Sequence, residues 1–142
     1  MNVYLHESYS AVIRSVDDYY KANMDMLCSC KRSQIFPAGR PVRAKPHDEV
    51  STYYCEGASV HRSLVADNCI IEGKLENCIV FSGARIGKGA KLKNCILMRG
   101  CTVGEGAELS HVIVDKHSTI CPGVTLVGSD KLPVVVPKFS NI

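Results

Sequence analysis

The sequence predicts an all-β fold, a parallel β-helix of roughly four triangular coils preceded by one amphipathic α-helix. Three observations support this prediction. The phrase GKGAKL (87–92) returns as GEGAEL (104–109), 17 residues later. Large aliphatic residues fall into three columns at nearly the same period. Upstream of them, residues 10–27 place apolar side chains at helical spacing.

The three columns of aliphatic residues begin at Val60. A repeat of fixed period determines the architecture, because each unit stacks on the next. The columns hold Val60, Leu75, Leu92, Leu109 and Leu126; Val65, Val80, Leu97 and Val114; and Ile70, Ile86, Val103 and Ile120. The steps are 15 or 16 at first and 17 afterwards. Three short strands therefore make one coil, and coils stack about 4.8 Å apart, like strands in a sheet.

A mostly small residue lies two positions before each large aliphatic residue. A spacing of two places both side chains on the same face of a strand, so we expect both to point inward. The small residues are Ala58, Gly73, Ala90, Ala107 and Val124; Ser63, Cys78, Cys95 and Val112; and Asn68, Ala84, Cys101 and Ser118. Glycines between the strands suit the corners, because glycine tolerates positive φ.

The residues between each small and large pair point outward. They are mostly polar in the first and third columns and apolar in the second. The apolar ladder consists of Leu64, Ile79, Ile96 and Ile113, and the next outward positions add Phe81 and Met98. A ladder of this size should not face water. Either a helix of the same chain covers it, or it is an interface with another domain or subunit; both can hold together.

Residues 10–27 predict the amphipathic helix that could cover this ladder. Ile13, Val16, Tyr20 and Leu27 recur at helical spacing, and Asp17 lies off that stripe. At the other end of the chain, PVVVP (133–137) is an apolar segment bounded by prolines, which suits an edge strand. We expect residues 1–56 to form a linker helix and a basic extended segment, and residues 57–142 to form the β-helix domain with its terminal strand.

The basic segment after the helix contains Arg43 and Lys45, and its prolines keep it irregular or extended. It is either a solvated linker or part of a site for an anion.

Composition excludes several classes of function. The formal net charge of +3 is too small to argue for nucleic acid. No apolar run reaches the length of a membrane span, and the first 20 residues lack a secretory signal. The 8 cysteines include no C-x-x-C pair, and Cys28 and Cys30 form a C-x-C. We expect free thiols in a reducing cytoplasm, and no metal, cofactor or catalytic residue.

The motifs Ile86-Gly-Lys-Gly-Ala-Lys and Val103-Gly-Glu-Gly-Ala-Glu resemble the hexapeptide repeat, whose family folds as a left-handed parallel β-helix. The handedness is implied by this resemblance alone. The segment SVDDYYKANMDML (15–27) resembles the helix that links the catalytic and β-helix domains of bacterial glucose-1-phosphate adenylyltransferases. Residues 111–138 resemble the end of the same family. The order of these motifs is most similar to the GlgD type, the non-catalytic or regulatory subunit of the heteromeric enzyme.

The resemblance also implies where an effector would bind. In the family, lysines near this end help to bind phosphorylated effectors, which nominates Lys116 and, on a weaker match, Lys138. Two departures stand beside them: His117 replaces the family's asparagine, and Phe139 follows Lys138 where relatives tend to have glycine. The family's nucleotidyltransferase domain has no counterpart in the sequence. We therefore expect a C-terminal fragment that is inactive alone.

Three hypotheses of function follow. The first is a regulatory and oligomerisation domain of a GlgD-type subunit in glycogen biosynthesis, with other adenylyltransferase subunits as partners. The second is a small hexapeptide acyltransferase with His111 or His117 as general base, and His61 as a third candidate. The third is a plain oligomerisation module without an effector.

Overall fold

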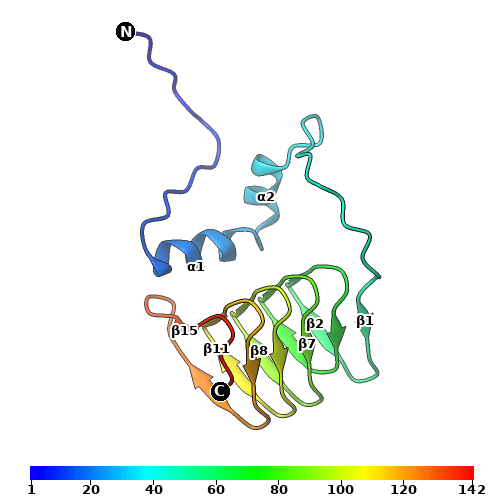
Figure 1. The fold of residues 1–142 in the computed structure, drawn as a ribbon. Helices are drawn as coiled ribbons and strands as arrows, with labels where there is room; N and C mark the ends of the chain where they lie inside the picture. The colour runs from blue at the N-terminus through cyan, green and yellow to red at the C-terminus, as the bar shows by residue number, and fades with distance from the viewer.

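The computed structural model describes residues 1–142 and contains 15 strands and two helices. The strands form three parallel sheets of five strands, which are the three faces of a solenoid of about four turns, consistent with the predicted left-handed β-helix (Figure 1). Sheet A contains β1 (Tyr53–Tyr54), β4 (Ile70–Ile71), β7 (Arg85–Ile86), β10 (Thr102–Val103) and β13 (Thr119–Ile120). Sheet B contains β2 (Ser59–His61), β5 (Lys74–Glu76), β8 (Lys91–Lys93), β11 (Glu108–Ser110) and β14 (Thr125–Val127). Sheet C contains β3 (Leu64–Val65), β6 (Ile79–Val80), β9 (Ile96–Leu97), β12 (Val112–Val114) and β15 (Val134–Val136).

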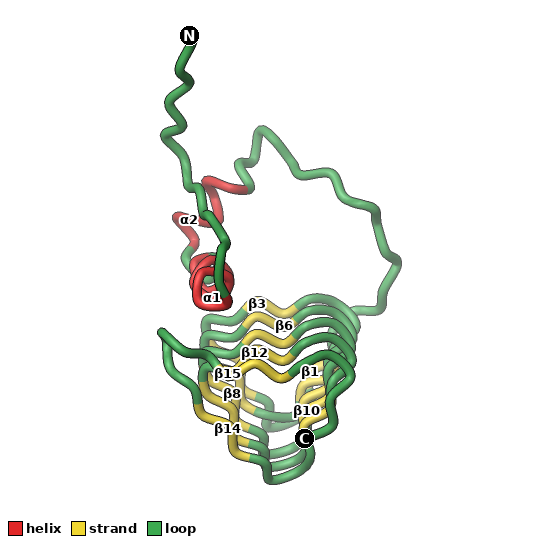
Figure 2. The backbone as a smooth tube through the Cα atoms, turned by 60° about the vertical axis from the view of Figure 1, so that its left-hand side comes forward, coloured by secondary structure: helices red, strands yellow, loops and turns green.

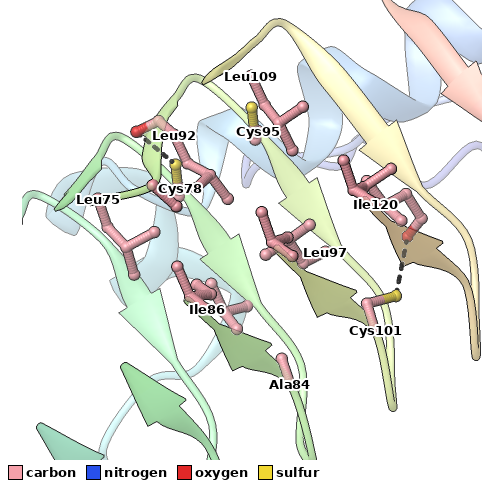
Figure 3. Close-up of a cluster of buried hydrophobic side chains, with 14 of the residues drawn as sticks. Leu75, Cys78, Ala84, Ile86, Leu92, Cys95, Leu97, Cys101, Leu109 and Ile120 are labelled. Atoms are coloured by element: carbon pink, nitrogen blue, oxygen red, sulfur yellow. Dashed lines mark hydrogen bonds between the residues drawn. The ribbon is translucent and has the colours of Figure 1, made fainter. Parts of the chain in front are cut away.

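The core lies inside the coils, where the predicted inward columns meet. Leu75, Leu92 and Leu109 stack on successive coils and are at most 2% exposed (Figure 3). Cys78 and Cys95 are fully buried beside them, and the Cys78 thiol donates to the Leu92 carbonyl at 3.4 Å. These cysteines pack as small apolar side chains, as the sequence predicts.

Glycine serves two different needs at the corners. Gly89 has a φ of +73°, which a side chain would strain. Gly87 has no such φ, but a Cβ there would lie 2.8 Å from the Glu105 backbone nitrogen of the next coil. The first glycine of each Ile-Gly-x-Gly or Val-Gly-x-Gly phrase thus allows close approach, and the second allows the turn.

Two positions in the third column are wrong. Asn68 is predicted to point inward, but it is exposed and adopts a corner conformation with a φ of 59°. Ile70 is predicted to point inward, but it pairs with Arg85 on the outer face and is 37% exposed, while Cys69 and Ile71 point inward at 1% and 0%. The corner that leads from Ile71 to Leu75 is two residues shorter than the corner at the same place in the next coil. The step along every column is therefore 15 at this coil.

The predicted edge strand is confirmed, because β15 pairs in parallel with β12 at the end of sheet C. The coils also extend upstream of Gly57, since β1 pairs with β4.

The helical region differs from the prediction of one helix. The first helix, α1 (Val16–Asp25), starts later than expected, because the Ser15 hydroxyl caps it by accepting from the Asp18 amide at 3.1 Å. A second helix, α2 (Ser29–Ile35), occupies a stretch predicted to be irregular. The stretch contains no glycine, and its first proline is Pro37, beyond the last turn. Neither helix is long and apolar enough to cross a membrane.

Candidate functional site on sheet C and the last coils

Helix α1 lies against the outer face of sheet C, which carries the apolar ladder (Figure 2). Tyr20 is 3% exposed and packs against Ile96 and Ile113, which are 0% and 3% exposed. The Tyr20 hydroxyl donates to the Asn94 carbonyl at 2.7 Å. Burial raises the pKa of Tyr20, so the hydroxyl keeps the proton that it donates. The helix thus combines apolar contact with one directional hydrogen bond.

The two ends of α1 reach opposite ends of the coil stack. Val16 and Tyr19 line a groove of about 540 Å³ with Ile113 and Val135, near the last coil. Leu27, just past the helix, lines a hollow of about 260 Å³ with Leu64, on the first coil. The helix therefore crosses the whole ladder.

The predicted interface residues are consequently either covered within this chain or exposed at the margin of the face. Ile79, Ile96 and Ile113 are buried in the chain itself, and Leu64 and Met98 are half-buried. Phe81 remains 42% exposed at the margin of the face. Phe81 and Val135, at 45%, are thus the large apolar side chains of this face that are open to a partner.

The lysines predicted to bind an anion lie on neighbouring turns. The Phe139 amide donates to the Lys116 carbonyl at 3.2 Å, which fixes the two backbone segments side by side. The Lys138 ammonium lies 4.6 Å from the centre of the Phe139 ring. This cation–π contact holds the Lys138 charge over its own neighbour.

The two departures from the family pattern contact each other. His117 and Phe139 have φ values of 55° and 59°, so both occupy corner positions that usually favour glycine or asparagine. Their rings stack at a centroid distance of 5.7 Å and an angle of 13°. The stacked pair places an apolar cover beside Lys116 and Lys138.

A second cation stands near Lys116 that sequence reasoning missed. Arg99 and Lys116 line a hollow of about 350 Å³ together with Tyr19, Phe81 and Asp115. Arg99 precedes Lys116 by one 17-residue step, so the repeat could have identified it. Arg99 also binds Glu49 at 2.8 Å, which ties the segment before β1 to the coils.

Arg43 and Lys45 lie in the exposed segment between α2 and β1 and form no ion pair or hydrogen bond. The structure therefore does not join them to Lys116 or Lys138.

The three histidines considered for acyl transfer occupy different settings. His111 is half-buried; its Nε2 lies 2.8 Å from Asp130 Oδ1 and 3.2 Å from Asn94 Nδ2, and its Nδ1 lies 3.0 Å from Ser110 Oγ. These contacts fasten the loop before β15 to the coils. His117 is stacked on Phe139, and His61 is exposed on sheet B. No cluster of three or more potential metal ligands exists.

Comparison with known proteins agrees with the fold and with the motif order. The family described as GlmU-like, C-terminal hexapeptide, matches residues 46–132. The glycogen biosynthesis protein GlgD of Bacillus subtilis (strain 168) is 40% identical over 88 residues, which are 62% of this chain and 26% of that protein. GlgD of Geobacillus stearothermophilus is 39% identical over 69 residues, covering 49% of this chain and 20% of that protein. The glucose-1-phosphate adenylyltransferase of Geobacillus stearothermophilus is 33% identical over 87 residues, which cover 61% of this chain and 22% of that protein.

The chain thus spans only about a quarter, or less, of the length of these relatives. The family match at residues 46–132 covers most of the stack of coils, which carries the hexapeptide phrases and the small inward residues. On this basis the chain belongs to the GlmU-like C-terminal hexapeptide family, with GlgD proteins and glucose-1-phosphate adenylyltransferases among its relatives.

Proposed function

We propose that this chain is the regulatory and assembly domain of a GlgD-type subunit, acting in glycogen biosynthesis in the cytoplasm. The observation that carries the proposal is the likeness to two GlgD proteins, at 40% identity over 88 residues and 39% over 69. The domain would act by contact: the rigid coils present one apolar face, and other adenylyltransferase subunits would bind beside α1.

The exposed margin of sheet C supports this mode of action. Tyr20 covers the centre of the apolar ladder, whereas Phe81 and Val135 remain exposed to solvent at the edges of the same face. Large aromatic anchors beside a buried apolar centre are typical of subunit interfaces. A partner that covers Phe81 would also touch α1, so the position of α1 would influence the contact.

The hollow beside α1 supports a role for a phosphorylated effector. Arg99 and Lys116 supply two cations, Asp115 opposes them with a carboxylate, and Arg99 is also paired with Glu49 at 2.8 Å. A phosphate bound by both cations would also contact Tyr19 and Phe81, which line the same hollow. An anion bound there would thus act on both α1 and the open edge of sheet C.

The test is to mix the purified chain with the glucose-1-phosphate adenylyltransferase of the same organism and to measure the mass of the complex by light scattering after gel filtration. A mixed complex supports the proposal, and separate elution of the two proteins refutes it. Titration with a sugar bisphosphate should show binding that weakens at least tenfold in Lys116→Gln and is unchanged in Lys88→Gln. Equal binding by both variants would remove Lys116 from the site.

Acyl transfer remains the competing function. The Ser110, His111 and Asp130 contacts are the observation that favours it. Incubation with acetyl-CoA and a panel of amines and alcohols decides between the two. Turnover that His111→Ala abolishes would replace the contact function with an enzymatic one.

A further inference from the structure

Two exposed thiols face each other at the junction of the helices. Cys28 occupies the N-cap position of α2 and Cys30 lies in its first turn, and their sulfur atoms are 2.8 Å apart. Both side chains are exposed. Of the remaining cysteines, four are buried in the coils, while Cys55 and Cys121 are half-buried and lie against Glu72 and Asn141. The pair is therefore the one place where two accessible thiols meet.

The surroundings make the two thiols chemically unequal. The hydrogen bond from the Cys30 thiol lowers the pKa of Cys28, and the backbone amides of Lys31 and Cys30 and the Lys31 charge lower it further. The same hydrogen bond raises the pKa of Cys30. The lowered pKa makes Cys28 the first of the two thiols to lose its proton, and Cys30, 2.8 Å away, is placed to react second.

We propose that Cys28 and Cys30 form a reversible dithiol–disulfide site that exchanges with low-molecular-weight disulfides. The Cys28 thiolate attacks one sulfur of the external disulfide, whose S–S bond breaks and releases one thiolate. Cys30 then loses its proton and attacks the Cys28 sulfur of the mixed disulfide, which releases the second small thiol. Two protein thiols are oxidised and one external disulfide is reduced to two thiols, so the exchange balances.

The position of the site gives the disulfide a local effect. The Cys28 amide donates to the Asp25 carbonyl at the end of α1, and Lys31 in α2 binds Asp25 at 2.5 Å. Closing a bond from Cys28 to Cys30 therefore constrains the first turn of α2, directly beside its contacts with the end of α1. Arg32 of α2 lines a hollow with Val60 and Leu64 of the first coil, but neither cysteine belongs to the buried core of the coils, so the bond would form outside that core (Figure 1).

The test treats the full chain with oxidised glutathione and reads the products by intact mass and peptide mapping. The wild type should lose two hydrogens, about 2 Da, with Cys28 and Cys30 linked, and dithiothreitol should reverse the change. Cys28→Ser and Cys30→Ser should each stop at a mixed disulfide that carries one glutathione on the remaining cysteine of the pair. Cys55→Ser is the matched control and should behave as the wild type.

Two results would overturn the proposal. In one, the wild type accumulates stable glutathione adducts at Cys28 or Cys30 without an internal link. In the other, the pair stays reduced, or links to a different cysteine, at glutathione concentrations that modify the single variants. Neither result depends on a partner subunit, so the test is independent of the proposed function.

Discussion

Replacing Tyr20 with alanine should release α1 from sheet C and leave the coils intact. The side chain is 3% exposed, packs on Ile96 and Ile113, and donates to the Asn94 carbonyl. Truncating a buried aromatic side chain costs about 3 to 5 kcal/mol. The cluster that joins α1 to sheet C contains 3 buried residues, Tyr20 among them, whereas the core of the coils contains 19, so the cost falls on the docking of the helix.

An undocked α1 should also melt, because a helix of 10 residues is marginal in water without tertiary contacts. Hydrogen exchange read by mass spectrometry measures this directly. A loss of 3 kcal/mol or more corresponds to roughly hundredfold faster exchange or greater, so the amides of α1 should lose protection. The amides of β9 and β12 should keep theirs. Tyr20→Phe, which removes only the hydroxyl, should cost about 1 kcal/mol and accelerate exchange roughly fivefold.

Lys21→Ala is the matched control in the same helix. Lys21 is exposed and forms a surface ion pair with Asp17 at 2.5 Å, and such pairs contribute little to stability because water and salt screen them. Exchange in α1 should therefore stay within a few-fold of the wild type. The reasoning fails if Tyr20→Ala leaves α1 protected, or if the strands of sheet C lose protection to the same extent.

Three further predictions concern the coils and the thiol pair. Gly87→Ala should destabilise the fold by about 1 to 3 kcal/mol, because the added Cβ would press on the next coil. Gly39→Ala is the control; its Cβ meets open space, so its free energy of unfolding should stay within about 0.5 kcal/mol of the wild type. Equal denaturation midpoints for the two variants would refute this. Ala84→Leu should also destabilise the fold by about 1 to 3 kcal/mol, because Ala84 is fully buried and a larger side chain would overpack the core. Each kcal/mol corresponds to about 3 °C of melting temperature. An unchanged melting temperature would contradict the inward position of Ala84. Iodoacetamide at about pH 8 should label Cys28 faster than Cys30, because the pKa of Cys28 is lowered and that of Cys30 is raised. This preference should shrink as the pH rises above both pKa values. Equal labelling rates of the two cysteines, measured on their peptides, would contradict the prediction.

The repeat made most of the coil architecture predictable, because inward small and large residues recur with a period. Ile70 is the exception, because the repeat is irregular at this coil. The corner after Ile71 is two residues shorter than the next one, and alternation alone cannot locate this deletion when Ile70 and Ile71 are both aliphatic. Equal 15-residue steps in all three columns would have located it.

The candidate site was less predictable, because its contacts join residues far apart in the chain. The hydrogen bond from Tyr20 to Asn94 spans 74 residues, and no local pattern indicates it. The stack of His117 on Phe139 similarly joins two corners that each look like an isolated departure. Arg99 was predictable from the sequence, since it lies one 17-residue repeat before Lys116 and lines the same hollow.

The most direct test of the central claim measures the affinity of this chain for a glucose-1-phosphate adenylyltransferase of the same organism by analytical ultracentrifugation. The two matched variants are Phe81→Asp, on the open margin of sheet C, and Val127→Asp, on sheet B, where the wild-type side chain is 68% exposed. The account predicts a complex that Val127→Asp retains and that Phe81→Asp weakens by about 2 kcal/mol, or roughly 30-fold. Absence of a complex with the wild type, or equal affinity in the two variants, would contradict the claim that this face of the β-helix contacts its partner.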